Sequence, residues 1–276
     1  MKQAAKVSVK LLITVVLLTI AVRSADLDAL FRAAAQVSLG TIAVSTAILL
    51  SLAAVQAARW RLVLAAMGRC FGHTVLLGWV LIGLFFSQLL PSSIGGDVMR
   101  VWKLHQAGAP ASKAFNSVLL DRITALLAAV FITSAGVLLT ELSSIPAARY
   151  ATMGMLFAVV LGYLIVILTS RAPDVLQLVT RPLGTRASAL SRTMADDLGA
   201  VLLNPRVIVP TIALSCLIHF GASTAVWMIA RDAGAEIRLA TCIVLVPLVV
   251  LFSMLPVSIA GWGLREGAMV VTMGAV

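Results

Sequence analysis

The stretch LPSSIGGDVMR, residues 90–100, interrupts an otherwise apolar chain and returns as LPVSIAGWGLR at residues 255–265. Six of the eleven positions are identical, which proves little by count alone in a chain of such biased composition. The residue types carry more weight, because a membrane helix tolerates Pro, paired Gly and Arg only where the backbone breaks and the charge has a partner. Broken segments in corresponding positions of two halves point to the binding site of a membrane transporter.

The composition predicts an integral membrane protein. Of the 276 residues, 61% are hydrophobic and 12% are charged, whereas soluble domains have about 45–50% apolar and about 25% charged residues. The formal net charge of +10 does not indicate nucleic-acid binding. The basic residues lie in short clusters between apolar runs, as in the cytoplasmic loops of membrane proteins.

Apolar runs give the expected helices of a single domain that covers residues 1–276. We predict helices at 7–22, 33–58, 117–139, 151–169, 207–230 and 267–276. Two further runs, 74–90 and 239–255, lead directly into the two copies of the repeat. They are near the lower limit of about 17 residues for a spanning helix, so spanning and re-entrant interpretations are both open for them. The last run is too short to span, which indicates either a truncated chain or a helix completed in another way.

Charge placement favours the re-entrant interpretation of the first segment. If the run 74–90 crossed the membrane, the basic segment 171–206 would face the outside, against the rule that cytoplasmic loops are rich in Lys and Arg. If residues 74–99 enter and return to one side, fourteen Lys and Arg residues, among them the cluster Arg59, Arg61 and Arg69, lie in cytoplasmic segments and five lie in outer ones. We therefore predict a re-entrant segment and a cytoplasmic N-terminus.

The second copy of the repeat then approaches from the other side. The run 239–255 starts at the outer face in this topology, and if it also re-enters, the two copies form an inverted repeat. The predicted fold is an all-α polytopic membrane protein with about six full transmembrane helices and two re-entrant broken segments in an inverted repeat.

The segment 171–206 is predicted to be a cytoplasmic amphipathic connector. Its apolar residues recur every four positions, at Leu190, Met194, Leu198 and Leu202. Arg192, Asp196 and Asp197 are expected to point elsewhere. This pattern fits a helix lying on the membrane surface, and a solvated connector is an equal alternative.

Three charged constellations are expected at membrane depth: Asp97 with Arg100, Asp121 with Arg122, and Arg265 with Glu266. A helix that starts at the Gly-Gly break would place Asp97 and Arg100 on one face and expose free backbone N–H groups to an anion. Adjacent residues point about 100° apart on a helix, so Asp121 and Arg122 must each find a partner elsewhere. The backbone of the breaks is expected at Pro91, Gly95, Gly96, Pro256, Gly261 and Gly263.

Charges inside the membrane indicate function, because each costs at least ~2.5–3.5 kcal/mol to insert. The alternative to a ligand-binding role is a structural one. In that case the charges form ion pairs, Asp97–Arg122 or Asp121–Arg100, that only hold helices together. The Arg forks fit phosphate or carboxylate groups, which favours an anionic ligand. The residues Trp60, Trp102 and Trp262 are interpreted as anchors at the membrane interface. No metal site and no cofactor are expected, because the His and Cys residues lack ligand spacing; His219 is expected to bond to a neighbouring helix.

At these residues the chain resembles a known family, the flippase-like membrane domain of bacterial lysylphosphatidylglycerol synthases and its stand-alone relatives. The family pattern is Pro-x-x-x-Gly-Gly-Asp-x-x-Arg, an Asp-Arg pair, and a second Pro- and Gly-containing segment that ends in Arg-Glu. It is found here at Pro91 to Arg100, at Asp121-Arg122 and at Pro256 to Glu266. Ala260 stands where the family commonly has Gly, and the 276 residues include no soluble aminoacyl-transferase domain.

The resemblance implies lipid translocation in the bacterial cytoplasmic (inner) membrane. The expected ligand is an anionic or aminoacylated phospholipid. Its phosphate would be held by Arg100, Arg122 and Arg265, while Asp97, Asp121 and Glu266 would pair with these groups in the empty state or receive a cationic headgroup.

Two alternatives remain open at this stage. One is an intramembrane enzyme that acts on a lipid-linked substrate such as lysylphosphatidylglycerol, with Asp97 or Glu266 as general base. It is less favoured, because no His, Ser or metal-ligand spacing accompanies these carboxylates. The other is a subunit that partners a separate lipid-modifying enzyme.

Overall fold

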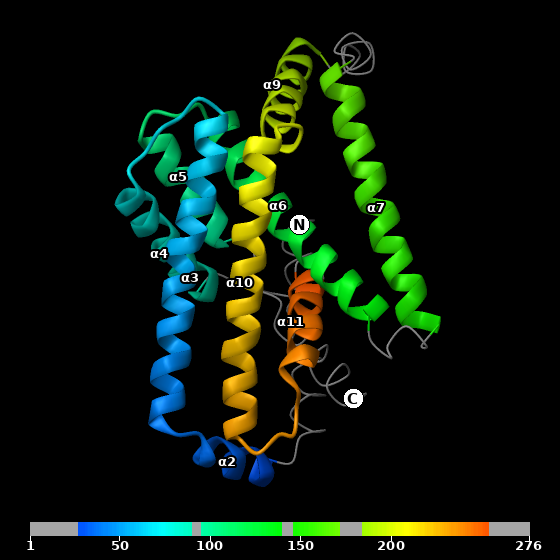
Figure 1. Ribbon diagram of the computed structural model, residues 1–276. Helices are drawn as coiled ribbons and strands as arrows, with labels where there is room; N and C mark the ends of the chain where they lie inside the picture. Colours follow the sequence, from blue (N-terminus) through cyan, green and yellow to red (C-terminus); the bar gives the residue numbers. More distant parts are fainter. Residues whose placement is uncertain (1–26, 90–94, 140–145, 172–183, 254–276) are drawn as a thin grey trace, which may run out of the picture.

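The computed structural model describes residues 27–89, 95–139, 146–171 and 184–253, and all regular secondary structure in these ranges is helical. The helices, labelled as in Figure 1, are α2 (Leu27–Gln36), α3 (Leu39–Ala66), α4 (His73–Leu89), α5 (Gly95–Gln106), α6 (Ala111–Leu139), α7 (Pro146–Arg171), α9 (Thr185–Leu202), α10 (Pro205–Asp232) and α11 (Leu239–Ser253). The predicted runs 7–22 and 267–276 and the second copy of the repeat lie outside the described residues.

Among the described residues, four helices are long and apolar enough to cross a membrane: α3, α6, α7 and α10. At 26 to 29 residues each, they extend for about 40 Å, which exceeds the hydrocarbon thickness of about 30 Å. The protein is therefore a multi-pass, all-helical membrane protein. These four helices correspond to four of the six predicted spanning runs.

The helix predicted at 33–58 is in fact two helices, and the second extends further. Ser38 separates α2 from α3, because its hydroxyl caps α3 by accepting a hydrogen bond from the Thr41 amide at 3.1 Å. Helix α3 then continues past Arg59 to Ala66 and ends before Gly68, whose φ of 75° no helix accommodates. The predicted end at residue 58 was too early. The prediction treated Arg59 as an exposed charge at a helix end, but Arg59 is buried and paired within the helix.

Helices α4 and α5 form an antiparallel hairpin that does not cross the bundle. They pack against each other, and the backbones meet so closely at Gly83 and Gly96 that a Cβ on Gly96 would lie 2.2 Å from the Gly83 carbonyl oxygen. With 12 residues, α5 rises only about 18 Å. The hairpin starts and ends at the end of the bundle that carries α9 (Figure 1). The re-entry of residues 74–99 into a membrane itself stays a prediction, because residues 90–94 lie outside the described residues.

Helix α11 starts at the opposite end. Helix α10 leads from α9 to the end near α2, where the Asp232 carboxylate accepts a hydrogen bond from the Ser38 amide at 2.7 Å, and α11 follows after a short turn. The entry side of α11 is therefore opposite to that of α4. The second repeat, at 255–265, lies outside the described residues, so the inverted repeat itself stays a prediction.

The connector contains the predicted helix, α9, but the placement of Asp197 was wrong. Asp197 is buried between α9 and α6, where it pairs with Lys113 and accepts a hydrogen bond from Asn116 Nδ2 at 2.8 Å. These partners compensate the carboxylate, so it need not face water. Helix α9 packs on α6, α7 and α10, with Val201 and Leu202 buried. Its apolar face thus covers the bundle.

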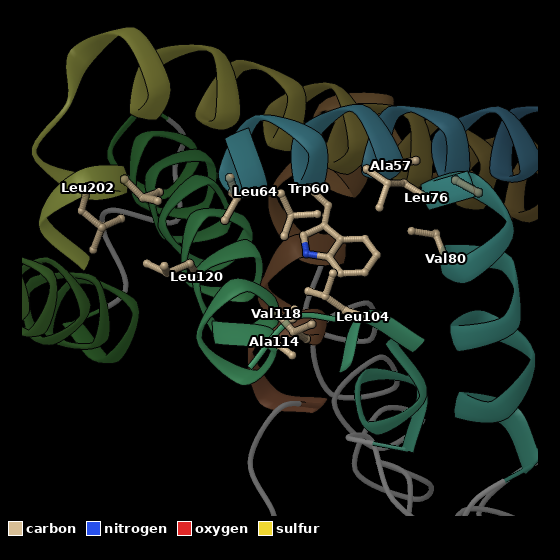
Figure 2. Close-up of a cluster of buried hydrophobic side chains, with 14 of the residues drawn as sticks. Ala57, Trp60, Leu64, Leu76, Val80, Leu104, Ala114, Val118, Leu120 and Leu202 are labelled. Atoms are coloured by element: carbon tan, nitrogen blue, oxygen red, sulfur yellow. The ribbon is translucent and has the colours of Figure 1, made fainter. Parts of the chain in front are cut away.

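The hydrophobic core gathers at the α9 end of the bundle. Its largest members are Trp60 and Leu64 from α3, Leu76 from α4, Leu104 from α5 and Leu120 from α6 (Figure 2). These side chains surround the α4–α5 hairpin and fix it against the long helices. The core therefore positions α4 and α5.

The Gly83–Gly96 approach predicts that Gly96→Ala destabilises the hairpin. The new methyl group would overlap backbone atoms, and overpacking of this kind costs about 1–3 kcal/mol. The measurement is the thermal unfolding midpoint of the purified protein in detergent. Gly78→Ala, on the same helix pair, is the matched control, because nothing lies within 4 Å of a Cβ there. Equal midpoints for the two variants would contradict the close approach.

Candidate functional site

Helix α5 starts at the Gly-Gly break and presents Asp97 and Arg100 one turn apart. Arg100 Nη1 lies 3.5 Å from Asp97 Oδ1, which is the i, i+3 pairing expected from the sequence. Gly95 and Gly96 are both buried. Because Gly96 has no side chain, the start of α5 can lie directly against α4 and bring its charged residues into the bundle.

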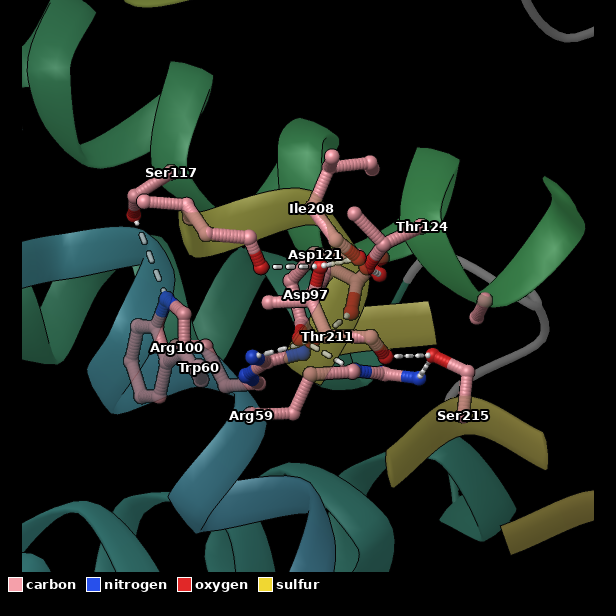
Figure 3. A network of polar contacts seen from close by, with 12 residues as sticks. Arg59, Trp60, Asp97, Arg100, Ser117, Asp121, Thr124, Ile208, Thr211 and Ser215 are labelled. Carbon is pink, nitrogen blue, oxygen red and sulfur yellow. Dashed lines mark hydrogen bonds and ion pairs between the residues drawn. The ribbon is translucent and has the colours of Figure 1, made fainter. Parts of the chain in front are cut away.

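Asp121 of α6 is the centre of the charged groups. Its side chain is fully buried, and each carboxylate oxygen accepts a hydrogen bond from a different Arg. Arg59 Nε donates to Oδ1 at 2.8 Å, and Arg100 Nη2 donates to Oδ2 at 2.7 Å (Figure 3). Asp121 therefore connects α6 to α3 and to α5 at once.

Arg122, the next residue on α6, points elsewhere and pairs with Asp97. We call Arg59, Asp97, Arg100, Asp121 and Arg122 the ion cluster. Both pairs named as the structural alternative, Asp97–Arg122 and Asp121–Arg100, are thus present. They differ in accessibility: the side chains of Arg122 and Asp97 are 28% and 14% exposed, but those of Arg100 and Asp121 only 3% and 1%.

Arg59 was missed in the sequence, where it was assigned to a basic cytoplasmic cluster. Besides Asp121, it donates from Nη1 to the Ser215 hydroxyl of α10 at 2.9 Å. Ser215 in turn donates to the Thr211 carbonyl at 2.7 Å. One signal was available, since apolar residues continue from Leu62 to Ala66 and allow the helix to extend through Arg59.

Trp60 belongs to the site and is not an interface anchor. It is fully buried, its indole N–H donates to the Ser117 hydroxyl at 3.3 Å, and the Arg100 guanidinium lies 4.2 Å from its ring centroid. A cation–π contact in a desolvated setting stabilises Arg100 in addition to its ion pairs. Trp102, by contrast, is exposed, as an anchor requires.

The ion cluster lies well inside the membrane-spanning part of the bundle. Asp121 is ten residues after the start of α6, and Ser215 is ten residues after the start of α10. At 1.5 Å per residue, both are about 15 Å from the α9 end. This is roughly a third of the length of these helices, so the cluster belongs to the half of the bundle nearer α9.

The cluster has an excess of positive charge and an unused donor. Its three guanidinium groups face two carboxylates, which leaves one formal positive charge among these five residues. Within the described part of the chain, Arg100 Nε is buried without a hydrogen-bond partner. A buried donor in this state costs about 1–3 kcal/mol. Both features favour an anion.

Several predicted site residues cannot be placed beside this cluster. Arg265, Glu266, Pro91, Pro256, Gly261 and Gly263 lie outside the described residues. Within the described ranges, no group of three His, Cys, Asp or Glu residues could hold a metal ion. His219 lies with Nε2 3.1 Å from the Ala125 carbonyl oxygen, the bond to a neighbouring helix that the sequence predicted.

We predict that Asp121→Asn strongly destabilises the protein. The variant leaves the buried Arg59 and Arg100 facing a neutral amide, and removal of one partner from a buried ion pair costs about 3–5 kcal/mol. The measurement is again thermal unfolding in detergent. Asp196→Asn, at an exposed position of α9, is the matched control. The central role of Asp121 would be refuted if both variants unfolded at the same temperature.

Comparison with known proteins gives one match. The family model of the lysylphosphatidylglycerol synthase TM region matches residues 7–276, nearly the whole chain. Neither the curated proteins nor the solved structures gave a match.

Proposed function

The chain belongs to the family of the lysylphosphatidylglycerol synthase transmembrane region, and on this premise we propose that it binds an anionic or aminoacylated phospholipid by its headgroup and translocates it between leaflets. The observation that carries the proposal is the Asp97–Arg122 pair, the accessible edge of an otherwise buried, positively charged cluster at membrane depth. Charges at such a depth are costly and indicate ligand pathways.

The headgroup phosphate would bind at Arg122. A guanidinium fork offers two parallel N–H groups that match phosphate as well as carboxylate, so the lipid phosphate can take the place of Asp97. One phosphate charge also neutralises the excess charge of the cluster.

Asp97 would then become available to a cationic headgroup. In the structure Arg122 and Arg100 neutralise it. When phosphate binds Arg122, Asp97 can accept the ammonium group of an aminoacylated lipid. Arg59, Asp121 and Arg100 stay paired throughout, because separating a buried pair costs several kcal/mol. The exchange is therefore confined to the accessible edge.

Translocation requires a second access state, which we assign to the second copy of the repeat. In this proposal Arg265 and Glu266 bind the headgroup at the opposite side of the membrane, in the way that Arg122 and Asp97 bind it at the α9 side. The two broken segments open one after the other. No P-loop motif occurs in the sequence, so the drive is expected to come from a gradient, the membrane potential or downhill lipid flow.

We place the α9 end in the cytoplasm, because it carries many of the basic residues of the connecting segments. The exposed native Cys70 lies at this end, in the turn after α3. A membrane-impermeant maleimide should label Cys70 only after spheroplasts are opened. Arg238→Cys in a Cys70→Ser background should be labelled in intact spheroplasts, because it lies at the other end. Labelling of both sites from one side would refute the topology.

The test of function is lipid exchange in liposomes that contain the purified protein and labelled phospholipid. Arg122→Ala should lower the exchange rate about tenfold to a hundredfold, because one charge-assisted hydrogen bond contributes about 1.5–3 kcal/mol. Arg192→Ala, at an exposed position of α9, is the control and should keep the wild-type rate.

The outcomes of this assay separate the candidate functions. Exchange that is unchanged in Arg122→Ala, with normal thermal unfolding, would overturn the headgroup site. Wild-type protein that leaves the lipid in place but alters it chemically would favour the enzyme alternative.

A further inference from the structure

An apolar groove of about 400 Å³ lies between α6 and α7 and is covered at one end by α9. Its walls include Ile123 and Leu127 from α6, Gly162 and Val166 from α7, and Leu198 and Leu202 from α9. The volume is within the range of small-molecule sites, about 300–1,000 Å³. Figure 1 shows that α6 and α7 are close together at the end away from α9 and separate toward the α9 end, where α9 lies between them.

Helix α7 makes few contacts that would close this groove. Among its side chains with described burial, only Thr152 and Val166 are buried, and its neighbours within the described helices are α6 and α9. An empty apolar space forfeits dispersion contacts on every wall and does not hold water. At membrane depth the groove must therefore be filled by an apolar occupant.

The α6 residues of the ion cluster are next to this groove in sequence but do not line it. On α6 the lining residues Ile123, Leu126, Leu127 and Val130 share one face. At 100° per residue, Asp121 points about 170° from the centre of that face, and Arg122 about 90° from it. Asp121 is thus directed away from the groove, whereas the partly exposed Arg122 lies one helical turn from the lining residue Leu126.

The direction of the groove also fits a lipid. Val130 is eight residues beyond Arg122 on α6, which places it about 12 Å further from the α9 end. A phosphate at Arg122 would therefore lie toward the α9 end, with apolar space extending from it toward the bilayer centre. This is the orientation of a phospholipid in the leaflet on the α9 side.

We infer that the α6–α7 groove binds an acyl chain of the anionic phospholipid whose phosphate is held at Arg122. The inference rests on the proposed function and adds the tail site to the headgroup site. The positive excess of the ion cluster selects an anionic lipid, and the apolar walls select its chain. Gly162 keeps the groove open, because nothing lies within 4 Å of a Cβ built there.

The test uses vesicles of phosphatidylcholine that contain phosphatidylglycerol with a photoactivatable acyl chain. After illumination, peptide mapping should find label on the parts of α6 and α7 that line the groove. Gly162→Trp fills the groove and should abolish this label. Gly154→Trp is the matched control, since Gly154 is also on α7 with open space around it but does not line the groove.

A second arm tests the connection to the headgroup. Wild-type protein should be labelled about tenfold more by photoactivatable phosphatidylglycerol than by the phosphatidylcholine analogue, as expected from one charge-assisted contact. Arg122→Ala should remove this preference. If Arg122→Ala loses the preference for phosphatidylglycerol but is still labelled by the acyl chain, the headgroup and the tail are bound by separate residues, as proposed.

The inference is overturned if Gly162→Trp keeps the label on the groove residues. It is also overturned if a Cys at position 162 forms a disulfide with a Cys in residues 1–26 or in a second copy of the chain, because either result identifies another occupant. The lipid-exchange assay on the same samples keeps the two proposals apart. Groove label without exchange refutes translocation alone, and exchange without groove label refutes the tail site alone.

Discussion

The fold at the α9 end depends on one buried carboxylate, that of Asp121. Its two oxygens accept hydrogen bonds from Arg59 and Arg100, on helices that are separated from α6 in sequence. Arg59 extends the contact to α10 through Ser215. Four helices therefore meet at a single negative charge. Ions at this depth are stable only when each is paired, so a shift of any one helix would leave a charge without its partner.

This constraint divides the ion cluster into a fixed and an exchangeable part. Arg59, Arg100 and Asp121 are enclosed by protein, and Trp60 covers Arg100 from one side. The Asp97–Arg122 pair lies at the edge and is partly exposed. A ligand can compete for Arg122 without entering the buried part. The same residues can thus hold the helices together and still offer one replaceable contact, which is why the structural alternative and the binding proposal need not exclude each other.

The sequence predicted the helices better than the partners of the charged side chains. The long apolar runs became α3, α6, α7 and α10, and the rule against neighbouring charges pairing on a helix correctly required separate partners for Asp121 and Arg122. Arg59 and Asp197 were assigned to the surface, because composition rules treat a charge beside an apolar run as a mark of its end. Their partners are 62 and 81 or more residues away, and a single sequence carries no record of such pairs.

The depth of the ion cluster limits what it can do alone. In the proposed function, a cluster at about 15 Å from the α9 end would reach a headgroup from one leaflet only. A phosphate that left Arg122 for the other leaflet would have to cross more apolar bundle, where an unpaired charge costs several kcal/mol or more. The proposed translocation would therefore need a second cationic site on the far side, and we propose the repeated Arg265 for it. In this view the broken segment is repeated because one binding site cannot serve both leaflets of a membrane of this thickness.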